Sequence, residues 1–345
     1  MPHEKLSERE RQILEAVVQS YVETAEPVGS RNIARRFKLG VSAATVRNAM
    51  SDLEEKGLLF HPHTSAGRVP TDRAYRLYVD SLMAISPPTP ELEAALREEL
   101  TAEGSAIGAI LRRAAQMLTV LTQELGVAVA PTFENAILER LELLTVSAAR
   151  MMLVLTLRSG VVRTIFVEVP GLIHPRAVAT IAAILNDRLA GLTLREIRQT
   201  LRERLRDAAG TPSEHELLDI FLATGEQIFD VPSAEGDVLL GRTNALAEQP
   251  EFQSGERLRE LLALTEQRAQ LRHVLADGTR ALGIAVTIGG ENQAEQLSRF
   301  SLVTSPYRAG PLSGVIGVIG PTRMPYEKVL ALVEHTSRMV SDLLR

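Results

Sequence analysis

Hydrophobic residues near the N-terminus recur at the spacing of one-sided helices. Residues 7–24 repeat apolar side chains every three to four positions, which predicts an amphipathic first helix. Ser7 and Glu10 have the spacing of a capping box at its start. Pro27 and Gly29 end it. The pattern therefore predicts a helix that packs one face on a core.

Two further helices follow in the arrangement of a helix–turn–helix. Residues 31–37 predict a short helix with Ser30 as its expected cap. Gly40 supplies the sharp turn that such a motif needs. Ser42 then begins a third helix, and Gly57 ends it.

The third helix has two different faces. At about 100° per residue, Ala49, Met50 and Leu53 fall within about 60° of Val46, so these four apolar residues form one face. The opposite face is small and polar. It is centred on Ala44, Asn48 and Ser51, with Thr45 and Arg47 beside them. Asn can pair with adenine, Arg with guanine, and the free amides after Ser42 with phosphate. The alternative is an exposed polar helix without a ligand.

A turn-rich hairpin follows the third helix. Residues 58–60 predict a strand and residues 61–69 a loop that returns to a second one, so the whole predicts a winged helix. The hairpin can bring four polar residues to phosphate or a minor groove: His61, His63, Thr64 and Arg68. The two histidines also suggest a metal pair, but no third ligand accompanies them. We therefore expect surface or phosphate contact.

The rest of the chain predicts an α+β domain with an inserted part. Residues 86–90 contain three prolines and mark a linker. Predicted strands form two groups that are separated by a long helical interval. The groups are 127–130, 141–146, 150–157 and 161–169, and then 282–288, 300–304 and 314–319.

The helical interval contains two informative stretches. Residues 177–185 are apolar on every side, which predicts burial in a core or a subunit interface. Residues 194–206 carry five arginines above a leucine stripe. They suggest a second nucleic-acid surface or, because acidic residues are interleaved, an ordinary solvated helix face. We favour a symmetric dimer through this interval, because operator symmetry commonly mirrors a protein two-fold axis.

Composition excludes several classes of protein. The 345 residues contain no cysteine, which excludes disulfides, thiol catalysis and cysteine-ligated metals. The net charge of the chain is −5, but residues 1–83 are nearly neutral, with 12 Lys and Arg against 11 Asp and Glu. A nearly neutral domain can still carry a basic face toward phosphate. No phosphate-binding loop, hydrolase elbow, zinc motif or dinucleotide fingerprint occurs, so we expect neither an enzyme nor a cofactor. No apolar run reaches the length of a membrane span, and no secretory signal is present, so we expect a cytoplasmic protein.

Several motifs resemble those of the HrcA family of bacterial heat-inducible transcription repressors. They are LSERERQIL, AEPVGSRNIA, SAATVRNAMSDLEEKGLL, HTSAGRVPTDRAYRLYVD and, near the end, GVIGVIGPTRMPYEKV. The resemblance implies a homodimer that binds the inverted-repeat CIRCE operator in double-stranded DNA upstream of the GroE and DnaK chaperone operons. It also implies that the GroEL chaperonin maintains the active repressor.

The resemblance, together with the strand groups, gives an expected domain organisation. We expect a winged helix at 1–85, a linker and helical connection at 86–122, a GAF-like domain at 123–170 and 279–345, and a dimerisation insertion at 171–278. Two alternatives stay open. The GAF-like domain can sense a small anionic molecule through Arg299, Tyr307 and Arg323, or the chain can be an RNA-binding or structural interaction module.

Overall fold

The computed structural model describes most of the chain, and its contacts divide the chain into two compact units. The described residues are 6–62, 67–102, 107–131, 136–158, 160–169, 171, 173–206, 208, 211–229, 238–278, 283–310 and 312–344. Unit 1 comprises residues 1–129, 238–307 and 315–343. Unit 2 comprises residues 130–237, 308–314 and 344–345.

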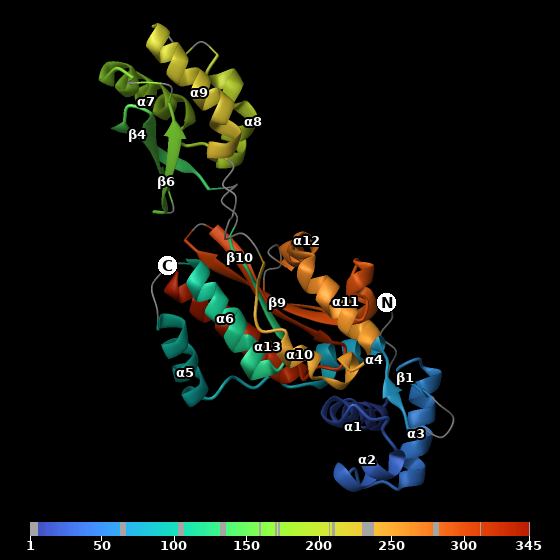
Figure 1. Cartoon of the computed structure of the whole chain (residues 1–345). Coiled ribbons are helices and arrows are strands. Elements are labelled where there is room, and N and C mark those ends of the chain that lie inside the picture. Colours follow the sequence, from blue (N-terminus) through green and yellow to red (C-terminus); the bar gives the residue numbers. More distant parts are fainter. Residues whose placement is uncertain are drawn as a thin grey trace. The chain divides into compact units, whose positions relative to one another are not determined.

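The N-terminal part of unit 1 is a winged helix–turn–helix (Figure 1). Its turn contains Gly40 in the left-handed region, at φ +68°, as the sequence predicts. A short antiparallel ribbon pairs Leu59 with Pro70 and Phe60 with Val69. The elements are α1 (Glu8–Thr24), α2 (Ser30–Arg36), α3 (Ala43–Glu55), β1 (Leu59–Phe60), β2 (Val69–Pro70), α4 (Asp72–Leu77) and a π-helix (Tyr78–Leu82).

The predicted helix starts agree with the structure at two of three positions. Ser7 and Glu10 form the predicted capping box of α1. Ser42 caps α3 by accepting a hydrogen bond from the Thr45 amide. Ser30 does not cap α2, because the helix begins one residue earlier than expected and Gly29 takes the cap position without a side chain.

The C-terminal part of unit 1 is built on a five-stranded sheet in the order β7-β3-β10-β9-β8. Its strands are β3 (Leu125–Val129), β7 (Val238–Leu240), β8 (Ala285–Ile288), β9 (Phe300–Ala309) and β10 (Leu312–Pro321). Its helices are α5 (Pro90–Thr101), α6 (Ile107–Thr122), α10 (Asn244–Ala247), α11 (Gly255–Glu266), α12 (Arg268–Gly278) and α13 (Tyr326–Leu343). Three 3₁₀ turns span Pro250–Phe252, Gly289–Glu291 and Glu295–Leu297.

Helices cover both faces of this sheet (Figure 1). Val127 packs in a cluster with Leu264 of α11 and Leu271 of α12. Gly126 points the other way, because a Cβ there would lie 2.0 Å from the Ala115 carbonyl of α6. β3 is buried along its whole length, so both of its faces must be apolar or small.

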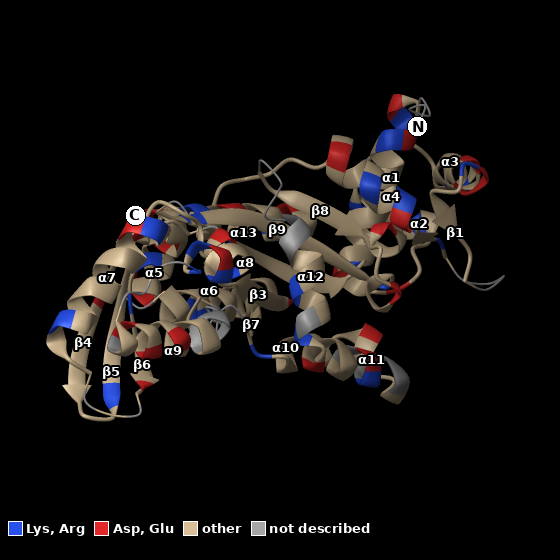
Figure 2. Cartoon of the chain, turned by 90° about the horizontal axis from the view of Figure 1, so that it is seen from above, with Lys and Arg blue, Asp and Glu red and all other residues tan. Residues whose placement is uncertain are grey.

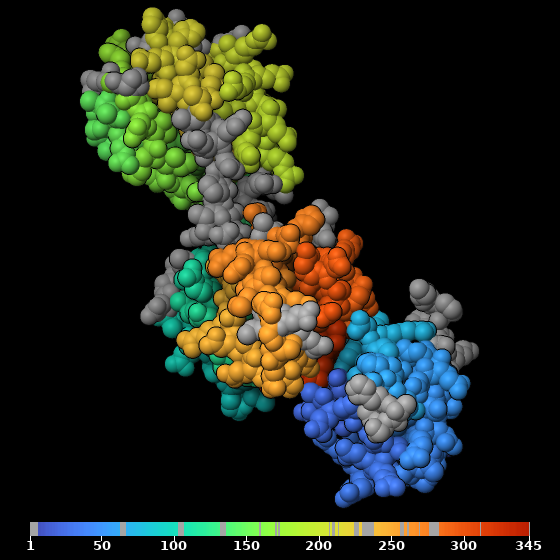
Figure 3. All heavy atoms as spheres, turned by 45° about the vertical axis from the view of Figure 1, so that its right-hand side comes forward, coloured from blue at the N-terminus to red at the C-terminus, as the bar shows by residue number. Residues whose placement is uncertain are grey.

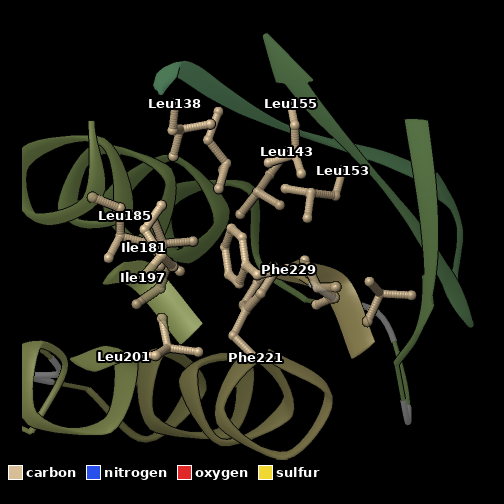
Figure 4. Packing of buried hydrophobic residues seen from close by; sticks show 14 of the residues in the cluster. Leu138, Leu143, Leu153, Leu155, Ile181, Leu185, Ile197, Leu201, Phe221 and Phe229 are labelled. Atoms are coloured by element: carbon tan, nitrogen blue, oxygen red, sulfur yellow. The ribbon is translucent and has the colours of Figure 1, made fainter. Parts of the chain in front are cut away.

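Unit 2 is a three-stranded antiparallel sheet, β4-β5-β6, with helices on one face. Its core joins Leu153 of the sheet with Ile181, Ile197 and Phe221 of three helices (Figure 4). The elements are β4 (Leu138–Ser147), β5 (Arg150–Leu157), β6 (Val162–Glu168), α7 (Pro175–Leu189), α8 (Leu194–Arg204) and α9 (Pro212–Phe229).

The compact units differ from the expected domain boundaries in two places. The strands over 138–168, which we expected in the GAF-like domain, pair only with one another and belong to unit 2. Residues 238–278, which we expected in the insertion, belong to unit 1, because β7 pairs with β3. The α+β fold class with an N-terminal winged helix is confirmed.

Two stretches of special composition have structural explanations. Within this chain α7 buries one side, whereas Ala179 and Ala183 are exposed in the stretch that the sequence predicts to be buried in a core or a subunit interface. Gly317 and Gly320 lie in β10 where a Cβ would meet Val303 and Glu124 at 2.4 Å. These glycines therefore serve tight packing.

Candidate DNA-binding surface

α3 is fixed at both ends by its own sequence. At the start, the Ser42 hydroxyl accepts a hydrogen bond from the Thr45 amide at 3.1 Å. At the end, the Gly57 amide donates to Glu54 and the Leu58 amide to Leu53, which is the double hydrogen bond of a glycine-ended helix. Gly57 has φ +69°, a conformation that favours glycine. The helix length is thus set by local chemistry.

The two faces of α3 are those that the sequence predicts. Its inner face is buried and consists of Val46, Ala49, Met50 and Leu53. Its outer face brings together Ala44, Arg47, Asn48 and Ser51, all exposed, with Thr45 half-buried and Ser42 exposed at the start. Within the described residues, no hydrogen bond or ion pair occupies the side chains of Arg47 and Asn48. This face is therefore open to a ligand.

The base of the wing is anchored to α3 and to the loop before α2. Arg68 lies 2.8 Å from Glu54, and its side chain is only 15% exposed. Its backbone exchanges two hydrogen bonds with Val28. His61 contacts the other oxygen of Glu54 at 2.9 Å. A phosphate contact by Arg68 would require the Glu54 pair to open.

Gly67 explains why the wing can approach so closely. A Cβ at this position would lie 2.4 Å from the carbonyl carbon and oxygen of Val28. Backbone atoms cannot yield, so only glycine fits. The predicted contacts of His63 and Thr64 lie outside the described residues.

The sequence interpretation omitted a basic edge beside α3. Arg31, Arg35 and Lys38 are exposed on α2 and on the turn that follows it. The basic stretch Arg35-Arg36-Phe37-Lys38 is the sequence signal for this edge. Arg36 differs, because it pairs with Glu23 and lies over the Phe37 ring. Elsewhere in the winged helix the two signs of charge are mixed (Figure 2).

The three residues that suggested an anionic ligand do not form one site. Tyr307 is fully buried, where its hydroxyl donates to the Val129 carbonyl at 2.9 Å and burial raises its pKa. Arg323 is held by both oxygens of Glu251. Arg299 is exposed and lies 3.5 Å from Glu260. The charges of the two arginines are thus paired within the protein.

The described part of the chain offers little for other chemistry. Among those residues, no group of three or more His, Asp or Glu side chains is placed to hold a metal ion. None of the helices in the described residues is both long and apolar enough to cross a membrane. Its most distinctive surface remains the outer face of α3.

A capped helix with a small polar outer face, followed by an anchored wing, defines the winged helix–turn–helix class of DNA-binding domain. Residues 5–81 match the family described as "Winged helix-turn-helix transcription repressor, HrcA DNA-binding". Residues 108–330 match "HrcA protein C terminal domain". The chain belongs to the HrcA family.

Relatives and a solved structure match the whole chain. "Heat-inducible transcription repressor HrcA" of Chlorobium phaeobacteroides (strain BS1) is 38% identical, with 98% of each chain covered. The protein of the same name from Geobacter sulfurreducens (strain ATCC 51573 / DSM 12127 / PCA) is also 38% identical and covers 98% of each chain. A crystal structure described as "a hypothetical protein at 2.2 A resolution" is 22% identical, covers 99% of each chain and has a TM-score of 0.62. It shares the fold.

Proposed function

We propose that this chain is a cytoplasmic repressor of heat-shock chaperone operons, and that it binds the inverted-repeat CIRCE operator as a homodimer. The open, polar outer face of α3, in a chain of the HrcA family, carries this proposal. One copy of α3 enters the major groove at each half of the operator. Operators with two-fold symmetry suit dimers of this kind.

Different residues then read bases and hold the backbone. Asn48 and Arg47 have the side chains for bidentate contacts to adenine and guanine. Ser42, Ala44, Thr45 and Ser51 surround them and allow close approach. Arg31, Arg35 and Lys38 contact phosphate beside the groove, as the first helix of this motif commonly does. The wing residues His61, His63, Thr64 and Arg68 add contacts to the backbone or minor groove.

The dimer forms through unit 2 in this proposal. One face of its sheet is covered by helices, whereas the other exposes three large apolar side chains: Leu144, Val162 and Phe166, which are 45–58% exposed. An exposed apolar patch of this kind marks an interaction surface. Arg150 and Glu168 lie opposite each other on the same face, so it offers both charges to a second copy.

The GroEL chaperonin maintains the active repressor in this proposal. Family membership supports this step, and mass action explains it, because a partner that favours the active state raises its population. When damaged proteins occupy the chaperonin, less repressor is active and the operons are transcribed.

A footprint on the chaperone promoters of the source organism, with and without chaperonin, tests both parts. We expect protection of an inverted repeat by folded dimer, and weaker protection after the chaperonin is depleted. A folded dimer that protects no inverted repeat would refute the operator. Unchanged occupancy after depletion would refute the chaperonin step alone.

A further inference from the structure

The last helix of the winged helix is joined to the C-terminal part of unit 1 by polar contacts. Asp72, the first residue of α4, accepts a hydrogen bond from the Gly290 amide at 3.0 Å. The fit is close, because a Cβ at Gly289 would lie 2.0 Å from the Asp72 carboxylate. Gly289 also has φ +52°. This 3₁₀ turn is therefore shaped to receive α4.

Arg76, one turn further along α4, makes the strongest of these contacts. Its Nε donates to Oε1 of Glu291 at 2.8 Å, and its Nη2 donates to Oε2. The same Nη2 donates to the Val286 carbonyl at 2.7 Å. Two parallel hydrogen bonds between a guanidinium and a carboxylate fix orientation as well as distance. Glu291 is itself held, since it accepts from the Ile288 amide at 2.9 Å.

A second group of contacts lies beside α13. The Tyr78 hydroxyl donates to Glu327 at 2.6 Å. Arg323 donates to the carbonyl of Val22, at the end of α1, while Glu251 holds its other nitrogens. Contacts from α1, α4 and the π-helix thus meet three separate segments. We call these contacts the clasp: Asp72 with Gly290, Arg76 with Glu291, Tyr78 with Glu327, and Arg323 with Val22.

Apolar packing at this junction is incomplete. Tyr75 and Tyr326 are buried with their rings 5.9 Å apart. Beside them a cavity of about 500 Å³ is lined by both apolar and charged side chains, which include Phe60, Phe252, Asp72 and Arg323. Figure 3 shows the segment around residues 70–82 beside the surface of residues 285–325. Because the junction is not filled, directional polar contacts must set its geometry.

We propose that the clasp holds each winged helix in one orientation on its C-terminal part, so that the dimer reads half-sites at one spacing only. This inference rests on the proposed operator binding. Without the clasp, the winged helix would be connected through residues 83–89, which contain no helix or strand. Such a tether would accept several spacings, because a flexible linker fixes neither distance nor rotation.

The test compares an operator of natural spacing with one whose spacer is longer by about five base pairs, roughly half a helical turn. We expect the unmodified dimer to lose affinity strongly on the longer spacer. Arg76→Met, Glu291→Gln and the double variant should each reduce this preference by about tenfold, because all three remove the bidentate pair. The double variant should add little to either single one.

A matched control keeps the inference separate from general damage. Arg338→Met removes an exposed arginine that pairs with Glu334 within α13, away from the junction. It should preserve the spacing preference. Circular dichroism measures whether each variant is folded, and sedimentation measures whether it is a dimer; only folded dimers enter the comparison.

The outcomes distinguish the two proposals. If the unmodified dimer binds no inverted repeat, the proposed function fails. If it binds and prefers the natural spacing, but the Arg76 and Glu291 variants keep that preference, the clasp does not set the spacing. Tighter binding by these variants with an unchanged preference would likewise overturn the inference, because the contacts would then be inhibitory.

Discussion

Asn48 and Arg31 are exposed polar residues of one domain with different expected roles. Asn48→Ala should reduce discrimination between operator and random DNA by about 1–3 kcal/mol, because a base-edge contact is lost. Arg31→Ala should weaken binding to both DNAs and reduce the salt slope by about one. Titrations at several salt concentrations measure both effects. If the two variants behaved alike, the division into base and phosphate contacts would be wrong.

Glu10 links the start of α1 to the end of α3. Its carboxylate accepts hydrogen bonds from Lys56 and from Ser7. The hydrogen bond from Lys56 lowers the pKa of Glu10, burial opposes this, and the net direction is downward. A lowered pKa in the folded state stabilises the fold above the unfolded value. That stability is lost as the pH falls through the folded value.

Glu10→Gln keeps the capping box, because Gln also serves at this position, but it removes the charge that pairs with Lys56. It should therefore destabilise the winged helix by about 1 kcal/mol at neutral pH. The difference should shrink as the pH is lowered below about 4, near the ordinary pKa of glutamate. Amide hydrogen exchange of α1 measures it. Glu8→Gln is the control, because Glu8 is exposed in the same turn. An equal loss in both variants, or one independent of pH, would contradict the assignment.

At the scale of elements, the wing depends on the contact between Gly67 and Val28. Gly67→Ala should break the backbone bridge between Val28 and Arg68, because the new Cβ would overlap the Val28 backbone. We expect a loss of about 1–3 kcal/mol in stability, as for other overpacked sites. Affinity should fall on all DNA sequences, because the wing is displaced.

Thermal unfolding and DNA titration measure the two effects of Gly67→Ala. Gly171→Ala serves as the control, because nothing lies within 4 Å of a Cβ there. Full DNA affinity with a weakened fold would show that the wing makes no contact with DNA.

The same elements show what the sequence can predict. The helices of the winged helix can be predicted from local signals. These are the capping box of Ser7 and Glu10, the cap at Ser42, and Gly57 in a left-handed conformation. The pairing of Arg68 with Glu54 does not, because residues far apart in sequence meet only after the wing folds. The expected phosphate contact of Arg68 therefore took no account of Glu54.

At the scale of the whole molecule, the sequence did not predict which strands pair with one another, and the expected domain boundaries were therefore misplaced. β3 and β4 are neighbours in sequence, yet they belong to different sheets. Alternation of polar and apolar residues predicts a strand but not its partner. One signal was present. β3 is a continuous apolar run, typical of a central strand, whereas β4 contains the charged residues Glu139, Arg140 and Glu142, as a strand with one open face can.

The open face of unit 2 gives the last prediction. Val162 and Phe166 project from β6 on the side away from the helices, and they are 58% and 51% exposed. Burying a side chain of this size contributes about 1.5–3 kcal/mol. Val162→Ser together with Phe166→Ser should therefore raise the dimer dissociation constant by at least about tenfold.

Sedimentation equilibrium measures the change in dimer stability. Thr164→Ser is the matched control, because Thr164 lies between the two on the same face and the change removes one methyl group. Phe166 lies 4.3 Å beneath the Arg150 guanidinium, so thermal unfolding must verify that the variant sheet is intact. The folded variant should bind a half-site like the unmodified protein but bind the full operator weakly, because two linked reading helices bind more tightly than one. A folded variant that stays dimeric would place the two-fold interface on another surface.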